Sequence, residues 1–313
     1  MGTSDDGGVR GQLLAGVELG GTKCICLLGT GPADIRALEE LPTQHPDLTL
    51  ARIEAVLDGW RAGAGFAALG LAAFGPLDLD RRSPRYGWVA RTPKPGWSGT
   101  ELAPRFARRY MLPVAIDTDV NGAALAEGRW GGAQGLADFG YVTVGTGIGV
   151  GLVVNGRTIG GANHTELGHI RVVRIRGDEF PGICPFHGDC LEGLASGPAI
   201  AARTGSDPDT LAPADPVWAQ EAHALAQLCH TLVLAAGPRR VFLGGGVMSG
   251  RPLLFTLIRQ CLQESLNGYP ATPEVGAGIG SFIVPPALGQ LAGPLGALAL
   301  AQDALRAVPM RGA

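Results

Sequence analysis

Two cysteines and two histidines of the kind that hold metal ions stand close together in this sequence. His169 is followed by Cys184, His187 and Cys190, a spacing of H-x14-C-x2-H-x2-C. Thiolate sulfur and imidazole nitrogen are the ligands that zinc prefers, and a structural zinc ion takes four of them in a tetrahedron. The alternative is two buried thiols and two ordinary histidines, since free cysteine often packs as a small apolar residue. The clustering favours a structural Zn²⁺ ion in a loop spanning 169–190, with no coordination position left for water.

Carboxylates flank this predicted zinc loop at both ends. Glu166 precedes His169 by three residues, and Glu192 follows Cys190 by two. A metal with four protein ligands holds its loop in place and does not activate water. We therefore expect the zinc to fix Glu166, His169 and Glu192 in space beside a binding site.

Three glycine-rich turns stand far apart in the chain. They are Gly20-Gly21-Thr22-Lys23, Gly145-Thr146-Gly147 and Gly244-Gly245-Gly246. Glycine has no side chain to keep a phosphate away, and consecutive amide N–H groups in such turns bind anions. The first turn alone is also an ordinary hairpin turn, and the two later turns strengthen the phosphate interpretation. A GxxxxGK[ST] loop and, at the first turn, a GxGxxG fingerprint are missing, which disfavours a P-loop NTPase or a Rossmann dehydrogenase.

Strands and helices must position these turns, and hydrophobic periodicity predicts both. Apolar runs at 12–19 and 24–28 predict a hairpin around the first turn, and the alternation over 139–156 predicts a second hairpin. The other predicted elements are helices at about 48–62, 121–130, 217–236, 252–267 and 294–307 and strands at about 66–74, 113–117 and 241–247. Two α/β halves that each open on a glycine-turn hairpin indicate an internal repeat, and therefore a two-lobed protein with a cleft.

Composition bounds the class of protein. The 313 residues are 46% apolar and 17% charged, which suits a folded chain of about two domains. A formal net charge of −3 argues against nucleic acid or an anionic membrane as a partner, because both attract basic surfaces. Six cysteines without a clear disulfide framework favour a reducing compartment. The N-terminus is polar and no apolar run is long enough to span a bilayer, so we expect a cytoplasmic location.

Eight motifs, taken together, resemble the ROK sugar kinases, and among them the bacterial fructokinase branch. The motifs are VELGGTK (17–23), AAFGPLDLD (72–80), TPKPGW (92–97), DTDVNGAALAEG (117–128), TVGTGIGVG (143–151), GGANHTELGH (160–169), CPFHGDCLEG (184–193) and LGGGV (243–247). The resemblance implies an α/β fold of the actin-like ATPase (ribonuclease H-like) type, with two lobes and an interlobe cleft. It implies an N-terminal lobe of 1–117 that includes a C-terminal helix at about 294–313, and a C-terminal lobe of 118–293.

The resemblance also implies a catalytic base. In the family an aspartate of an Asn-Asp pair takes the proton of the sugar hydroxyl, and here this position is Asp119, with Thr118 in place of the asparagine. Phosphoryl transfer needs such a carboxylate together with positioning and charge neutralisation. A second role for Asp119 is to cap the helix that follows it.

Sugar and nucleotide contacts follow from the same resemblance. It implies that carboxylates and polar groups bind the sugar hydroxyls, at Glu166, His169, Glu192, Asn163, Gly75 and Pro76. His164, in the same loop as Asn163, is either a further ligand contact or a surface residue without a function. The three glycine turns defined above are implied to bind ATP, with Mg²⁺ bridging the phosphates. Glu18 stands where most of the family has an aspartate and is the residue linked to the magnesium.

The implied function is ATP-dependent phosphorylation of D-fructose to fructose 6-phosphate. The sugar assignment depends on YGWVARTPKPGW and on the C-P-x-H-G-x-C form of the metal loop. The alternatives are a ROK kinase for mannose, glucose or N-acetylmannosamine, and a non-catalytic sugar-binding ROK protein. ROK repressors carry a helix-turn-helix domain, whereas about 15 acidic and glycine-rich residues precede the first hairpin here. We expect hexose and ATP as partners, no nucleic acid or membrane partner, and a homodimer.

Overall fold

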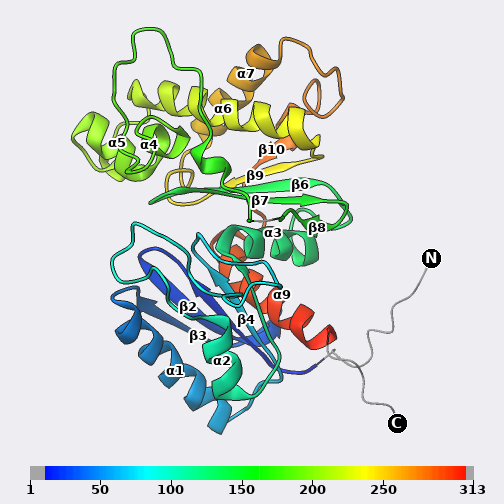
Figure 1. The fold of residues 1–313 in the computed structure, drawn as a ribbon. Coiled ribbons are helices and arrows are strands. Elements are labelled where there is room, and N and C mark those ends of the chain that lie inside the picture. The colour runs from blue at the N-terminus through cyan, green and yellow to red at the C-terminus, as the bar shows by residue number, and fades with distance from the viewer. Residues whose placement is uncertain (1–10, 162, 308–313) are drawn as a thin grey trace. The chain divides into compact units, whose positions relative to one another are not determined.

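The computed structural model describes residues 11–161 and 163–307, and these divide into two compact units (Figure 1). The first unit contains residues 11–131, 160–164 except 162, and 290–307, and the second contains 132–159 and 165–289. The first unit therefore extends beyond residue 117, where the sequence placed the end of the first lobe. The reason is the helix α3 (Asp119–Trp130), which packs against the last helix, α9 (Ala292–Arg306), within the first unit.

The first unit contains a five-stranded sheet in the order β3-β2-β1-β4-β5. Its strands are β1 (Leu14–Leu19), β2 (Lys23–Gly31), β3 (Asp34–Pro42), β4 (Leu69–Ala73) and β5 (Val114–Thr118). The first three strands pair antiparallel, whereas β4 and β5 run parallel to β1. The predicted hairpin around the first glycine turn is confirmed, with Leu19 opposite Cys24 at its closed end.

The sheet of the second unit has the same topology. Its order is β10-β9-β6-β7-β8. The strands are β6 (Phe139–Val144), β7 (Ile148–Val154), β8 (Arg157–Thr158), β9 (Val241–Gly244) and β10 (Ile283–Val284). Here too the first three strands pair antiparallel and the last two run parallel to the first. The internal repeat predicted from the two glycine-turn hairpins is thus present in the strand order of both sheets.

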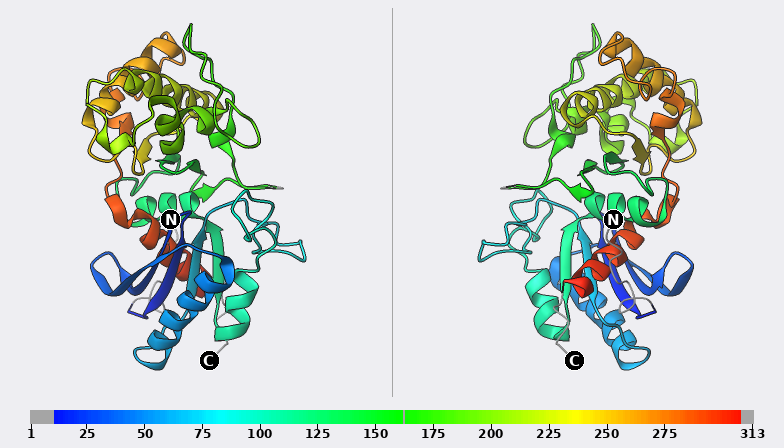
Figure 2. Two further views of the ribbon diagram at one scale, coloured as in Figure 1. Left: turned by 90° about the vertical axis from the view of Figure 1, so that its left-hand side faces the viewer. Right: turned by 90° about the vertical axis from the view of Figure 1, so that its right-hand side faces the viewer.

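Helices cover both faces of the first sheet, as the two views of Figure 2 show. On one face, α1 (Pro46–Ala62) and α2 (Ala103–Tyr110) bury Leu50, Ile53 and Phe106 against alternate strand residues such as Val17 and Leu71. On the other face lies α9, whose Ala297 and Leu300 form a small core with Ala72. Residues on successive strand positions point to opposite faces, which explains why Leu71 and Ala72 join different cores.

Helices cover the sheet of the second unit (Figure 1). The long helices are α6 (Val217–Ala236) and α7 (Pro252–Leu266), and the shorter ones are α4 (Leu191–Ala195), α5 (Gly197–Thr204) and α8 (Ile279–Phe282), the last of which precedes β10. The helix predicted at 217–236 is confirmed at both ends. Leu225, Leu228 and Leu232 of α6 are fully buried against the strands and α7.

Several elements were missed at the sequence level, for identifiable reasons. The strand β3 carries Glu39 and Glu40 on an exposed sheet edge, so it lacks an apolar pattern. The helix α2 contains three arginines in eight residues, and β8 and β10 are two residues long. Among the described helices, none combines the length and the apolar character that crossing a membrane requires.

Glycines allow α9 to lie directly on the first sheet. A Cβ atom at Gly70 of β4 would overlap the carbonyl oxygen of Ala297, and one at Gly16 of β1 would come 2.8 Å from the amide nitrogen of Leu298. Side chains at these two positions would therefore push the helix off the strands. The close packing of α9 depends on the missing side chains.

This packing predicts opposite effects for two glycine-to-alanine substitutions. Gly70→Ala should lower the free energy of unfolding by about 1–3 kcal/mol, because the added methyl group overlaps backbone atoms that cannot move independently. Gly59→Ala, in the exposed face of α1 with open space around it, should raise it by roughly 0.5–1 kcal/mol. Urea denaturation of both variants measures this, and equal stability of Gly70→Ala and the parent chain would contradict the account.

Candidate functional site

The four predicted metal ligands come together in the second unit. The ligand atoms of His169, Cys184, His187 and Cys190 all lie within 4.8 Å of one another. The Nδ1 atom of His169 is 3.4 Å from the sulfur of Cys190 and 3.7 Å from that of Cys184, and Nδ1 of His187 is also 3.7 Å from Cys184. In a zinc tetrahedron with Zn–S of about 2.3 Å and Zn–N of about 2.0 Å, nitrogen and sulfur are about 3.5 Å apart. The residues present therefore fit a zinc ion.

Backbone hydrogen bonds shape the loop that carries three of these ligands. The amide of Cys184 donates to the carbonyl of Gly188 at 3.1 Å, and the reverse bond is 2.9 Å. The left-handed backbone at Gly188, with φ of +61°, closes this turn. Arg171 then ties the turn down by donating to the carbonyl of His187 at 2.8 Å. Local turn geometry thus presents His187 between the two cysteines.

The sugar-binding candidates of the second unit surround the metal cluster. His169 ends a short 3-10 helix, Leu167–His169, that begins after Glu166. Since its Nδ1 atom faces the sulfurs, its Nε2 atom is directed elsewhere and lies 4.0 Å from a carboxylate oxygen of Glu166. Glu192 follows directly on the metal loop, in the first turn of α4. The cluster and the two carboxylates therefore belong to one locally connected structure.

Glu192 also contacts the second glycine turn. Its Oε2 atom accepts a hydrogen bond from the amide of Ile148 at 3.0 Å. A Cβ atom at Gly147 would lie only 2.6 Å from the same oxygen. The carboxylate is thus placed against the turn 145–147, which joins β6 to β7. A candidate sugar ligand and a candidate phosphate turn meet here within one unit.

The second and third glycine turns lie side by side. Strands β6 and β9 are parallel neighbours, and the turns 145–147 and 244–246 lie at their ends. The amide of Val247 donates to the carbonyl of Val144 at 3.0 Å. Gly245 has a φ of +91°, and a Cβ atom there would overlap Val144. The two turns predicted to bind nucleotide are therefore adjacent because the sheet makes their strands adjacent.

In the first unit, side chains donate hydrogen bonds to carbonyl oxygens of the turn 20–23. The carbonyl of Gly20 accepts from the hydroxyl of Thr43 at 2.8 Å, and that of Gly21 accepts from the ammonium of Lys94. The amides of Gly21 and Thr22 donate to no acceptor within the described residues. Two free neighbouring N–H groups are what an anion requires. Lys23, by contrast, points to Glu40, with 2.8 Å between Nζ and Oε2.

Asp119 begins α3 but does not cap it. The capping residue is Thr118, whose hydroxyl oxygen accepts from the amide of Asn121 at 3.2 Å. The carboxylate of Asp119 accepts from the amide of Val120 at 2.9 Å and is partly buried. The helix-capping alternative for Asp119 is therefore wrong, because the residue before it fills that role.

Glu18 lies close enough to Asp119 for their charges to interact. Its carboxylate packs against Gly293 in the first turn of α9. Burial first, and then the negative charge of Asp119, raise the pKa of Glu18 to about 7, while Lys23 acts in the opposite direction. Two carboxylates in one partly buried place repel each other, and a divalent cation would relieve that repulsion. The residues present therefore fit the predicted link to magnesium.

The turn Gly75–Pro76 meets the segment that contains Asn163. The amide of Leu77 donates to Nε2 of His164 at 3.0 Å. His164 is 8% exposed, so its alternative as a surface residue is wrong. Asn163 itself is exposed. The three sugar-contact candidates of the first unit thus lie in two neighbouring turns.

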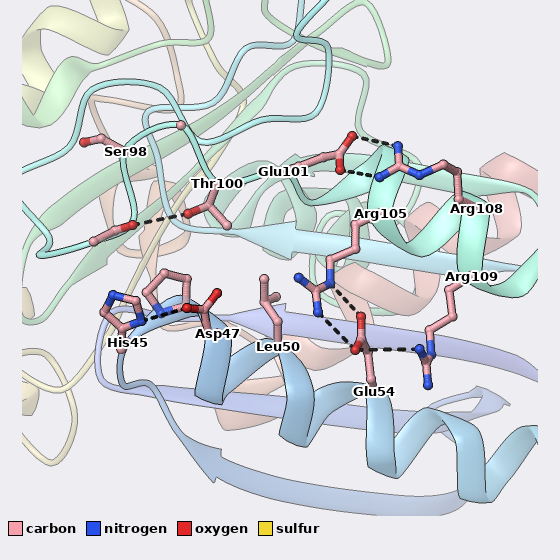
Figure 3. A pocket seen from close by; sticks show the side chains of 13 residues that line it. His45, Asp47, Leu50, Glu54, Ser98, Thr100, Glu101, Arg105, Arg108 and Arg109 are labelled. Carbon is pink, nitrogen blue, oxygen red and sulfur yellow. Dashed lines mark hydrogen bonds and ion pairs between the residues drawn. The ribbon is translucent and has the colours of Figure 1, made fainter.

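A cavity of about 670 Å³ in the first unit contains none of the predicted site residues (Figure 3). It is lined by the start of α1, by residues 96–101 and by α2. Its arginines are paired: Arg105 Nε is 2.6 Å from Glu54, and Arg108 Nη1 donates to Glu101 at 2.8 Å. The charged side chains that line this cavity are therefore compensated by one another.

The repeated sheet topology, with a glycine turn at the first hairpin of each unit, is that of the actin-like ATPase fold. A family model described as the ROK family matches residues 14–304. A putative fructokinase of Bacillus subtilis is 40% identical over 295 residues, which cover 94% of this chain and 97% of the relative. A fructokinase of Zymomonas mobilis is 43% identical over 290 residues, 91% of this chain and 95% of the relative. The crystal structure of a ROK family glucokinase from Streptomyces griseus in complex with glucose and AMPPNP superposes with a TM-score of 0.75 at 27% identity, over 93% of this chain and 99% of the other. The chain belongs to the ROK family.

The structure groups the predicted site residues by unit. Glu18, the turn 20–23, Gly75–Pro76, Asp119 and Asn163 belong to the first unit, and the other predicted contacts belong to the second. Their roles stay predictions. The residue that sequence reasoning did not assign is Lys94, which lies in the quoted motif TPKPGW and contacts Gly21.

The raised pKa of Glu18 predicts a pH-dependent stability. The shift from 4.5 to about 7 corresponds to about 3 kcal/mol at most. Because the folded-state pKa lies above the unfolded value, this stability is fully present below about pH 4.5 and is lost as the pH rises through about 7. In metal-free protein, Glu18→Gln should therefore become more stable relative to the parent chain between pH 5 and 8. Urea denaturation across this range measures the difference; Glu264→Gln, an exposed position on α7, is the control and should show no such change.

Proposed function

We propose that the chain is an ATP-dependent fructokinase that converts D-fructose to fructose 6-phosphate. The observation that carries the proposal is the identity of 40% and 43% to relatives described as a putative fructokinase and a fructokinase, over more than nine-tenths of this chain. The resemblance extends through both hairpin turns and the metal loop. A hexose kinase of different preference is the second candidate, since the glucokinase with a similar fold is described with bound glucose.

Asp119 would act as the general base of this reaction. Its carboxylate is held at the start of α3 by the Thr118 cap and by the hydrogen bond from Val120. It would accept the proton of the attacking sugar hydroxyl while the bond from oxygen to the γ-phosphorus forms and the bond to ADP breaks. A carboxylate fixed by backbone contacts costs little reorganisation at that moment.

Backbone amides of the glycine turns would bind the nucleotide phosphates. In the first unit the amides of Gly21 and Thr22 are free, and in the second unit the turns 145–147 and 244–246 lie together. Backbone N–H groups donate to phosphate oxygens without adding a bulky side chain. Glu18 would hold Mg²⁺ through water, and the ion would neutralise charge on the phosphates.

Glu166, Glu192 and Nε2 of His169 would bind the sugar hydroxyls. The carboxylates accept hydrogen bonds from hydroxyl groups of the sugar. A sugar that lacks one of these hydroxyls leaves a carboxylate oxygen without its hydrogen bond, and the affinity for that sugar is lower. Zinc at the cluster would fix the orientation of the His169 ring and of the two glutamates. It has no free coordination position, so it would serve structure only.

The reaction is tested by coupled ADP release with MgATP and a panel of sugars. Fructose should give the highest kcat/KM, ahead of mannose, glucose and N-acetylmannosamine. Asp119→Asn should lower kcat by about 100-fold or more while fructose still binds, because only the proton acceptor is lost. Turnover led by another hexose would transfer the assignment to the second candidate. Near-normal turnover of Asp119→Asn would remove this residue as the base.

The zinc assignment is tested by metal analysis and stability. The purified chain should contain one zinc ion, and Cys184→Ser should lose it and several kcal/mol of unfolding free energy, since metal binding contributes to folding. Cys261→Ser is the matched control, because Cys261 lies in α7 outside the cluster. Metal-free protein that unfolds at the same urea concentration as zinc-loaded protein would refute the assignment.

A further inference from the structure

The ammonium group of Lys94 lies at the first glycine turn. It donates a hydrogen bond to the carbonyl of Gly21 and stands over the ring of Phe74, 5.3 Å from the ring centre. Phe74 is the residue directly before the turn Gly75–Pro76. The lysine therefore connects a candidate phosphate turn with a candidate sugar turn.

The loop that carries Lys94 is firmly anchored. Three residues further on, Trp97 is fully buried and packs edge-on against Phe74, with ring centres 5.1 Å apart. Its indole nitrogen donates to the carbonyl of Gln44 at 2.9 Å. These contacts of Trp97 hold the backbone of the loop in place. The loop in turn holds the ammonium group of Lys94 near the glycine turn.

Within the described part of the chain, the positive charge of Lys94 has no carboxylate partner. The side chain is partly buried, and burial lowers the pKa of Lys94 from its usual value. Lys23 differs, because it is exposed and lies 2.8 Å from Glu40. A partly desolvated cation without a counter-ion is unfavourable in the free protein, and an anionic ligand would stabilise it.

The choice of lysine is unusual for this sequence. The 313 residues contain 23 arginines and only two lysines, Lys23 and Lys94. Both stand at this glycine turn. A compact ammonium group has three donors, so one can bind the Gly21 carbonyl while two remain for oxygen atoms of a ligand.

We propose that Lys94 is a further catalytic residue, the cation of the first unit that contacts the γ-phosphoryl group while it passes from ATP to the sugar. The inference rests on the proposed function, since it requires phosphoryl transfer. The bond from the γ-phosphorus to ADP breaks, the bond to the sugar oxygen forms, and the proton goes to Asp119. Lys94 stays protonated throughout and neutralises charge on the transferred group.

Chemical labelling tests the contact without any need for turnover. An amine-reactive ester modifies exposed lysines, and mass spectrometry reports Lys94 and Lys23 separately in one sample. With MgAMPPNP at about ten times its Kd, the labelling rate of Lys94 should fall about tenfold, because only free protein reacts. MgADP should protect Lys94 much less, because it lacks the γ-phosphate. Equal protection by both nucleotides, or protection of Lys23 with Lys94 unprotected, would overturn the proposal.

Kinetics of two variants separate catalysis from a merely structural fastening of the loop to the turn. Lys94→Met should lower kcat by about 100-fold to 1000-fold with KM for fructose changed less than about threefold. Lys94→Arg, which keeps the charge, should recover part of kcat. If Lys94 had only a structural role, Lys94→Met would lower the melting temperature and raise the KM for ATP and the KM for fructose, while kcat stayed within about threefold of the parent chain. This result would overturn the proposal.

The two assays also distinguish this inference from the proposed function. If no sugar is phosphorylated and yet MgAMPPNP protects Lys94, the contact to the γ-phosphate stands and the fructokinase assignment fails. If fructose is phosphorylated and Lys94 is labelled at the same rate with and without MgAMPPNP, the assignment stands and the inference fails. Labelling uses the unaltered chain, so its outcome does not depend on whether Lys94→Met folds.

Discussion

Close contact between backbones is the constraint on which this structure depends. Where α9 lies on the first sheet, Gly70 leaves room for the carbonyl of Ala297. In the second unit, Gly168 lies against the backbone of Ile148, and Gly193 against that of Gly188 in the metal loop. A side chain at any of these points would separate two segments. The same absence of side chains leaves the amides of Gly21 and Thr22 open in the first turn that is predicted to bind phosphate.

The charged side chains differ in whether they have a partner of opposite charge. Most arginines pair with carboxylates, as Arg105 does with Glu54 and Arg203 with Asp178. At the glycine turn of the first unit, burial instead raises the pKa of Glu18 and lowers that of Lys94, and burial in α6 of the second unit also raises the pKa of Glu221. Uncompensated charge is unfavourable in a folded protein unless a ligand supplies its partner. The cavity lined by α1 and α2 differs, because its arginines are paired with carboxylates.

The cluster of His169, Cys184, His187 and Cys190 shows how a local sequence pattern can predict which side chains come together before the fold is known. Cys184, His187 and Cys190 come from one turn, so their spacing alone brings them together, and only His169 must arrive from another segment. Prediction failed where the surroundings decide the state of a residue. His164 reads as a surface histidine in a polar run, yet it is buried and accepts a hydrogen bond from Leu77, 87 residues earlier.

The sequence by itself determined the two glycine-turn hairpins, the grouping of Cys184, His187 and Cys190, and the long helix α6, because each is encoded by residues close together in the chain. Tertiary structure alone decided that Thr43 and Lys94 complete the turn 20–23, that the turns 145–147 and 244–246 are neighbours, and that α3 belongs with the first unit. The physical reason is distance along the chain. Lys94 meets Gly21 across 73 residues, and residue spacing carries no information about which far segments a sheet and its covering helices bring into contact.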